Sequence, residues 1–149
     1  MRSPEYFDPI KVGRFNVIRV YYQFPGESGS EKLFVVLRHA KESSGADACW
    51  CIKTTSKTAW YEARPELMPG VITYDANELT FFPSRTIIDP FNFLAILHRH
   101  LATQSGKDKY KIEGMMPDDF HGKLTTAINQ NIRLEPKNAK HLLWCIKRE

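Results

Sequence analysis

Short apolar segments alternate with polar loops in the first part of the chain. Residues 14–24, 32–39 and 48–55 are rich in valine, isoleucine and aromatic side chains, and polar, glycine-containing loops at 25–30 and 41–47 separate them. Short runs of β-branched and aromatic residues between turn residues are typical of strands. We therefore expect three strands in this part of the chain.

Shorter apolar segments follow. Residues 57–69 contain two prolines and predict an excursion with a helical turn, and short strands are expected at 70–75, at 79–82 and at 85–89, where Pro90 ends the last one. Strands at roughly 8–12-residue spacing with turns between them favour a small antiparallel barrel or sandwich.

Helical signals appear toward the C-terminus. Residues 91–102 fit either a strand or a helix, because their apolar residues have helical spacing but also occupy the face that should be polar. Asp118 or Asp119 is placed to cap a helix with an apolar stripe at Phe120, Leu124, Ala127 and Ile128. Pro136 suits the first turn of a last helix.

The predicted fold class is α+β, a small antiparallel β-barrel with C-terminal helices. The polar, glycine-containing segment 104–108 is the best internal boundary. We therefore expect a β-barrel-like core domain at residues 1–106 and a helical extension at residues 107–149 packed on that core.

Composition and charge narrow the function classes. The chain has 149 residues, 21 basic and 17 acidic, so its formal charge of +4 permits nucleic-acid binding without requiring it. The three cysteines form no CxxC pair, which argues against a structural zinc site and a disulfide framework and favours reduced thiols. Residues 1–9 carry no signal-peptide pattern, and no apolar run reaches membrane-spanning length. We expect a cytoplasmic protein without metal, cofactor or membrane contact.

The strand at 48–55 ends in a cluster of hydroxyl side chains, Thr54, Thr55 and Ser56, between Lys53 and Lys57. Lysines and hydroxyls both donate hydrogen bonds to phosphate oxygens. A metal-free ribonuclease needs a group that takes the 2′-hydroxyl proton, a cation that stabilises the phosphorane and a donor for the leaving oxygen. This cluster is the candidate site, and the alternative is an ordinary polar strand end.

Aromatic and histidine residues nearby could complete such a site. Trp60 and Tyr61 could stack unpaired bases, although packing in the core explains aromatic residues more often. Arg38 and His39 end the strand at 32–39 and could supply charge and proton transfer, or form a rim without chemistry. His98 and His100 lack a known metal-ligand spacing and suit solvated or capping positions. A metal enzyme that uses them is the weakest alternative.

At these residues the chain resembles the PemK/MazF-like toxin family. The resemblance rests on the loop at Pro25–Ser30, the basic residue Lys32 before the apolar run Leu-Phe-Val-Val-Leu, the strand end Ile52-Lys-Thr-Thr-Ser56, and the segment Ser84-Arg-Thr-Ile-Ile-Asp89. It covers roughly residues 12–101. Where the family has Arg-Pro this chain has Lys32-Leu33, so the arginine's role passes to Lys32.

The resemblance implies an SH3-like barrel and a metal-independent endoribonuclease toxin that cuts single-stranded RNA. Lys32 and Arg38 would stabilise phosphate charge, Thr55 or Thr54 would contact the scissile phosphate, and His39 would transfer a proton. Lys53, Ser56, Lys57, Trp60 and Tyr61 would bind the RNA. An antitoxin protein would cover the same surface, and a homodimer is expected. The competing hypothesis is a non-catalytic SH3-like module that binds protein or nucleic acid.

Overall fold

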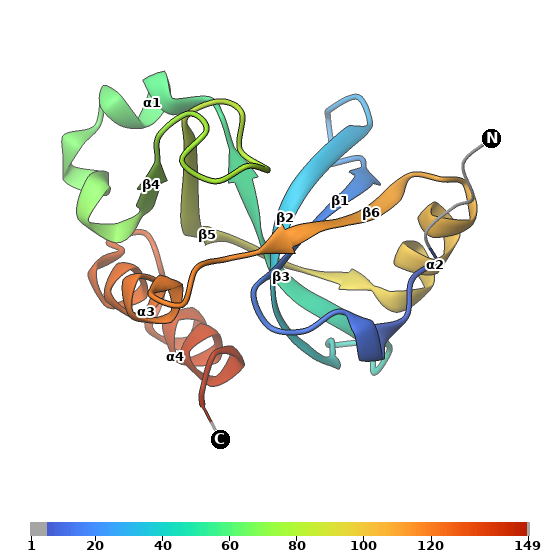
Figure 1. The fold of residues 1–149 in the computed structure, drawn as a ribbon. Coiled ribbons are helices and arrows are strands. Elements are labelled where there is room, and N and C mark those ends of the chain that lie inside the picture. Colours follow the sequence, from blue (N-terminus) through green and yellow to red (C-terminus); the bar gives the residue numbers. More distant parts are fainter. Residues whose placement is uncertain (1–5, 149) are drawn as a thin grey trace. The chain divides into compact units, whose positions relative to one another are not determined.

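The first part of the chain folds mainly into strands, and two helices lie at its C-terminal end (Figure 1). The computed structural model describes residues 6–148. Residues 1–5 and residue 149 lie outside the described residues, and so does the first part of segment 1–9, for which the sequence predicts no signal peptide. The strands are β1 (Asn16–Tyr22), β2 (Ser30–Lys41), β3 (Asp47–Thr55), β4 (Ile72–Tyr74), β5 (Thr86–Leu97) and β6 (Tyr110–Met115). The helices are α1 (Thr58–Glu62), α2 (His98–Gly106), α3 (Phe120–Gln130) and α4 (Pro136–Cys145), with 3-10 turns η1 (Pro9–Lys11) and η2 (Pro65–Gly70).

The strands hydrogen-bond in the order β4–β5–β3–β2–β1–β6, and the pairs β1–β2, β1–β6 and β4–β5 are antiparallel. The expected α+β class with C-terminal helices is therefore confirmed. The residues gather into two compact units. The first unit holds the chain up to Cys51 together with Leu94–Met116, and the second holds Ile52–Phe93 together with the residues from Pro117 onward. Each unit contains residues from before and after position 106. The division into two domains at that position stays a prediction.

The first unit is built around β1, which lies between β2 and β6. Ile18 pairs with Phe34 on one side and with Ile112 on the other, and a β-bulge interrupts the pairing with β6 between Val17 and Ile18. The core consists of apolar residues from several elements of this unit: Val12, Ile18, Val20, Phe34, Val36, Cys49, Cys51, Ile96, Leu101 and Tyr110. Burial of apolar side chains from successive strands is the main driving force for such an arrangement.

Two of the cysteines lie on β3. Cys49 and Cys51 alternate with Trp50, both lie in the core of the first unit, and both are buried free thiols. Burial raises the pKa of Cys49 to about 12, which keeps its thiol protonated and unreactive.

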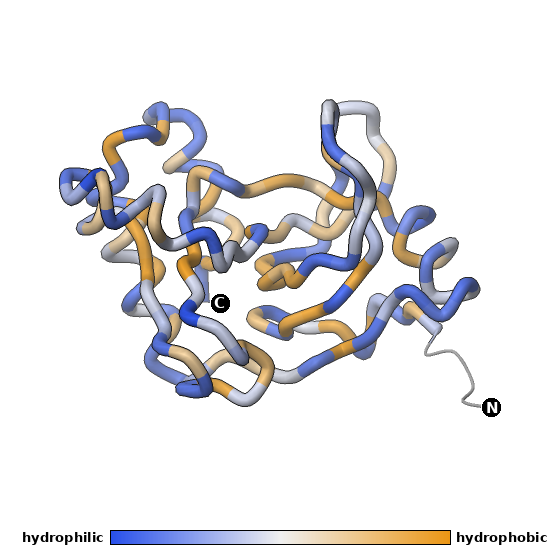
Figure 2. The backbone as a smooth tube through the Cα atoms, turned by 90° about the horizontal axis from the view of Figure 1, so that it is seen from above, coloured by the Kyte–Doolittle hydropathy of each residue, from blue (hydrophilic) through white to orange (hydrophobic). Residues whose placement is uncertain are grey.

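In the second unit, α3 packs against η2, β4 and α4. Its buried residues are Phe120, Leu124, Ala127 and Ile128, the stripe that the sequence predicts. A smaller core joins Tyr61, Leu67 and Ile87. Pro136 occupies the first turn of α4 as expected, whereas Asp119 precedes α3 without a side-chain capping bond. Figure 2 shows hydrophobic segments recurring along the chain, with hydrophilic segments between them.

Two predictions about elements were wrong, and one strand was missed. The expected strand at 79–82 is a turn, because Asn77 adopts φ 62° and its N–H bonds back to the Phe82 carbonyl at 2.9 Å. Pro90 does not end its strand, since β5 continues to Leu97 and α2 then begins at His98. β6 was not predicted at all.

No helix in residues 6–148 is both long enough and apolar enough to cross a membrane.

Gly70 provides a test of packing in the second unit. A Cβ placed on it would come within 2.5 Å of the Asn131 Cα, and the Asn131 Nδ2 donates to the Gly70 carbonyl at 2.9 Å. Gly70→Ala should therefore lower the free energy of unfolding by about 1–3 kcal/mol, because backbone at this contact must move. Urea denaturation measures the change.

The matched control is Gly122→Ala in α3, where a Cβ meets nothing within 4 Å. Alanine there should be neutral or stabilise by up to about 1 kcal/mol, since glycine is a poor helix former. Equal urea midpoints for the two variants would contradict the close approach at Gly70.

Candidate functional site

The hydroxyl cluster lies where β3 ends. Thr54 is buried at 8% exposure, whereas Thr55 is half-buried and Ser56 and Lys57 are exposed. The Thr55 Oγ1 accepts the Lys57 backbone N–H at 3.1 Å, a local turn that threonine favours at a strand end. Of the two threonines that the sequence left open, Thr55 is the more exposed.

The predicted cations lie on β2, in the first unit. The Lys32 Nζ donates to the Ser30 Oγ at 2.8 Å and lies 5.6 Å from the centroid of the Phe24 ring. Arg38 is half-buried farther along the same strand. Thr54 and Thr55 belong to the second unit, so the pairing of Lys32 with Thr55 stays a prediction.

His39 is held by two partners inside the first unit. Its Nε2 lies 2.6 Å from the Val12 carbonyl and its Nδ1 lies 2.9 Å from the His98 Nε2. A carbonyl can only accept, so Nε2 carries the proton and donates. In the neutral ring Nδ1 then accepts the N–H of His98. Both nitrogens of His39 are therefore engaged in structural bonds, which does not favour the predicted role in proton transfer.

The other two histidines of the region also have defined partners. His98, the first residue of α2, is half-buried, and its ring lies 5.1 Å from that of Phe7. The His100 Nε2 bonds to the Tyr21 carbonyl at 2.9 Å. The sequence suggested solvated or capping positions for both; His98 stands at the start of α2, and both side chains are half-buried. Among residues 6–148, no group of three or more His, Cys, Asp or Glu side chains is arranged to hold a metal ion.

The second unit contains a buried carboxylate that sequence reasoning missed. Asp89 is 1% exposed and accepts four hydrogen bonds. The donors are the Tyr61 hydroxyl at 2.8 Å, the Asn131 Nδ2 at 2.8 Å, the Phe91 N–H at 2.9 Å, and the Arg133 guanidinium, which also forms an ion pair with it. A carboxylate can be buried at acceptable cost when its oxygens are saturated in this way.

Tyr61 and Trp60 are neighbours on α1 but have different surroundings. Tyr61 is buried at 5% exposure, and burial followed by the Asp89 hydrogen bond raises the pKa of its hydroxyl. Its ring has little surface to offer a base. Trp60 is 43% exposed, with the Arg64 guanidinium 4.1 Å and the Arg133 guanidinium 5.2 Å from its ring centroid. Of the two aromatic residues that the sequence proposed for base stacking, Trp60 has the suitable exposure.

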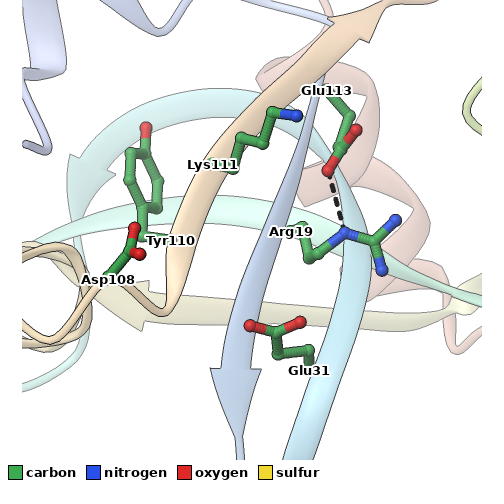
Figure 3. A pocket seen from close by; sticks show the side chains of 6 residues that line it. All are labelled: Arg19, Glu31, Asp108, Tyr110, Lys111 and Glu113. Atoms are coloured by element: carbon green, nitrogen blue, oxygen red, sulfur yellow. Dashed lines mark hydrogen bonds and ion pairs between the residues drawn. The ribbon is translucent and has the colours of Figure 1, made fainter. Parts of the chain in front are cut away.

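A pocket of about 250 Å³ opens on the sheet of the first unit (Figure 3). Its side chains come from β1, β2 and the region of β6: Arg19, Glu31, Asp108, Tyr110, Lys111 and Glu113. Arg19 and Glu113 point toward each other, and the Arg19 Nε lies 2.8 Å from the Glu113 Oε1. Three carboxylates stand against two cations, so the pocket is poorly suited to a phosphate.

The histidine pair predicts a pH dependence of stability. Burial and then the neighbouring His39 ring lower the pKa of His98 from its usual 6.5, while Asp47 and the Ala48 carbonyl act in the opposite direction. The unfolded chain binds a proton at a pH where folded His98 does not. Stability is therefore complete above pH 6.5 and declines as the pH falls below it.

His98→Gln keeps an N–H donor and removes the titration. Urea denaturation at about pH 7.5 and about pH 5.5 should show a smaller loss of stability for the variant than for the wild type. His141 shifts in the same direction through burial, so some slope remains in the variant. Identical slopes for the two proteins would contradict the account of the pair.

We call Asp89 and its four hydrogen-bond donors the Asp89 network. The network predicts that replacing Asp89 costs far more stability than replacing an exposed aspartate. Asp89→Ala should lower the free energy of unfolding by about 3 kcal/mol or more, because it leaves buried donors and a guanidinium without their acceptor. The control is Asp47→Ala, which removes an exposed ion pair to the Lys41 Nζ at 3.1 Å. That change should stay within about 0.5 kcal/mol. Similar urea midpoints for both variants would refute the network's role.

Comparisons with known proteins assign no family. No protein-family model matches the chain, and a search of curated proteins finds no match. The resemblance to PemK/MazF-like toxins therefore stays a prediction from the residues that carry it, and the function is argued from the geometry above.

Proposed function

We propose that the protein is a metal-independent endoribonuclease that cuts single-stranded RNA, with an SH3-like barrel as its scaffold. The observation that carries the proposal is the succession of residues after β3. Thr55 is partly exposed, Ser56 and Lys57 are exposed, and Trp60 is 43% exposed one helical turn later. Hydroxyls and a lysine that can bond a phosphate thus precede, within one short segment, an aromatic ring that can stack a base.

In this proposal Lys32 and Arg38 stabilise the charge on the scissile phosphate, and the Thr55 hydroxyl donates to one of its oxygens. The ribose 2′-oxygen gives its proton to water and attacks phosphorus. The bond to the 5′-oxygen breaks and that oxygen takes a proton from water, which leaves a 2′,3′-cyclic phosphate and a 5′-hydroxyl. Lys32 lies near the start of β2, and Thr55 ends β3. Lys53, Ser56, Lys57 and Trp60 bind the RNA on either side of the bond that is cut.

The partners follow from the same proposal. An antitoxin protein would inhibit by covering the RNA-binding residues, and two copies of the chain would form a homodimer. Toxin and antitoxin would meet in the cytoplasm. Tyr61 contributes indirectly here, because its hydroxyl bond to Asp89 fixes α1, the helix that carries Trp60.

A second candidate is a non-catalytic SH3-like module that binds RNA or protein. One observation favours it: His39, the predicted proton carrier, spends both ring nitrogens on bonds within the first unit. Such a module would bind RNA through the same exposed segment without cutting it.

Purified protein, incubated with single-stranded RNA in EDTA, should give fragments that end in a cyclic phosphate. Lys32→Ala and Thr55→Ala should each lower the cleavage rate by one to several orders of magnitude, given typical losses of about 2.7–4 kcal/mol when a preorganised donor is removed. Gel analysis of end-labelled RNA measures the rates.

The controls are Lys140→Ala on α4 and Thr126→Ala on α3, both at exposed positions. They should cut at the wild-type rate. Wild-type rates in Lys32→Ala and Thr55→Ala would place the chemistry elsewhere. RNA that stays intact at high protein concentration, yet binds, would favour the non-catalytic module.

A further inference from the structure

Two exposed aromatic side chains of the second unit lie against arginines. Trp60 and Phe91 are 43% and 44% exposed. The Arg133 guanidinium lies 4.2 Å from the Phe91 ring centroid and 5.2 Å from that of Trp60, and Arg64 lies 4.1 Å from Trp60. We call these four residues, Trp60, Arg64, Phe91 and Arg133, the stacking surface.

Hydrogen bonds orient the groups of the stacking surface. Asp89 accepts hydrogen bonds from the Arg133 guanidinium and from the Phe91 N–H, so one buried carboxylate fixes a cation and the backbone of an aromatic residue. The Arg64 Nη1 donates to the Trp60 carbonyl at 2.8 Å. Planar groups that are already oriented lose little conformational entropy when a ligand binds. This preorganisation distinguishes the surface from aromatic side chains that are exposed singly.

We propose that the stacking surface binds the unpaired bases of single-stranded RNA. The choice of RNA as the ligand rests on the proposed function. Aromatic rings and guanidinium planes are the two kinds of group on which proteins stack splayed-out bases. Guanidinium groups can in addition donate to phosphate oxygens with their remaining N–H groups.

Local charge supports an anionic ligand over a basic one. Lys57 precedes α1 and is exposed, and Glu62, the acidic residue of that helix, forms an ion pair with Arg85 at 2.5 Å. Its charge is therefore partly neutralised. The Asp89 carboxylate likewise balances the charge of Arg133, whereas Arg64 donates to the neutral Trp60 carbonyl, so Lys57 and Arg64 supply the positive charge here. The surface extends the RNA contact beyond Thr55–Trp60 to β5 and to the segment after α3, and it assigns Phe91, Arg64 and Arg133 a role in binding.

The test measures binding apart from cleavage. The probes are fluorescein-labelled 12-residue RNAs with 2′-O-methyl sugars, one rich in purines and one in pyrimidines, because a methylated 2′-oxygen cannot attack the phosphate. Fluorescence anisotropy in EDTA at low salt gives the dissociation constants. Trp60→Ala and Phe91→Ala should each weaken binding by about 5- to 150-fold, the range that loss of one stacked base typically gives.

Two further variants separate stacking from folding. Trp60→Phe keeps a ring and should restore most of the affinity that Trp60→Ala loses. Trp144→Ala removes a tryptophan of equal exposure, 45%, from α4 and should bind RNA as the wild type does. Thermal unfolding of each variant identifies any that fail to fold, and for those the comparison of Trp60→Phe with wild type decides.

Several results would overturn the proposal. Wild-type affinity in both Trp60→Ala and Phe91→Ala would do so, and so would equal losses in Trp60→Ala and Trp144→Ala. If wild type binds neither RNA but binds a glutamate–tyrosine copolymer through Trp60, the surface recognises protein instead.

The same experiment shows which of the two proposals fails, the stacking surface or the nuclease. Binding of RNA that depends on Trp60, without cleavage of unmodified RNA by wild type, would refute the nuclease and support the stacking surface. Normal cleavage and normal KM in Trp60→Ala and Phe91→Ala would refute the stacking surface and leave the nuclease standing.

Discussion

The buried carboxylate of Asp89 is the constraint on which the second unit depends. At 1% exposure it would be costly as an unpaired charge, and the chain offsets that cost with donors from α1, from the end of α3 and from the segment that follows. Segments that are far apart in the sequence must therefore meet at the Asp89 carboxylate. The position of Trp60, Phe91 and Arg133 follows from that convergence.

This constraint links packing to recognition. Large aromatic side chains at a surface are favourable only if something compensates for their contact with water, and here guanidinium groups cover part of the rings. The same planar groups are suited to bases, so a feature that stabilises the free protein also prepares it for a ligand. In the first unit, by contrast, His39 bonds to His98 and to the Val12 carbonyl through its two ring nitrogens, and its predicted role in proton transfer stays a prediction.

Local sequence patterns predicted the strands and helices whose structure depends mainly on neighbouring residues in the chain. The strand runs at β1 to β3, the stripe of α3 and Pro136 at the start of α4 were all readable, because period and capping residues are local signals. β6 could have been found from the alternation of Tyr110 and Ile112 with Lys111 and Glu113. Pro90 gave a local stop signal that pairing within the sheet overrides.

The candidate site was only partly accessible to such reasoning. The sequence singled out Trp60 and Thr55, but Asp89 read as a strand end before a proline. A lone aspartate after two isoleucines was the available signal, since a buried carboxylate requires partners. Those partners, Asn131 and Arg133, lie more than forty residues away, at separations of 42 and 44, and no periodicity connects them to it.

Nuclear magnetic resonance of the isotope-labelled protein, titrated with unlabelled, uncleavable RNA, tests the central claim most directly. If the Asp89 network presents a surface for bases, the indole N–H of Trp60 and the guanidinium N–H groups of Arg64 and Arg133 will shift, while the indole of Trp144 stays in place. Shifts confined to the first unit, around Arg19 and Lys111, with Trp60 unmoved, would contradict the account.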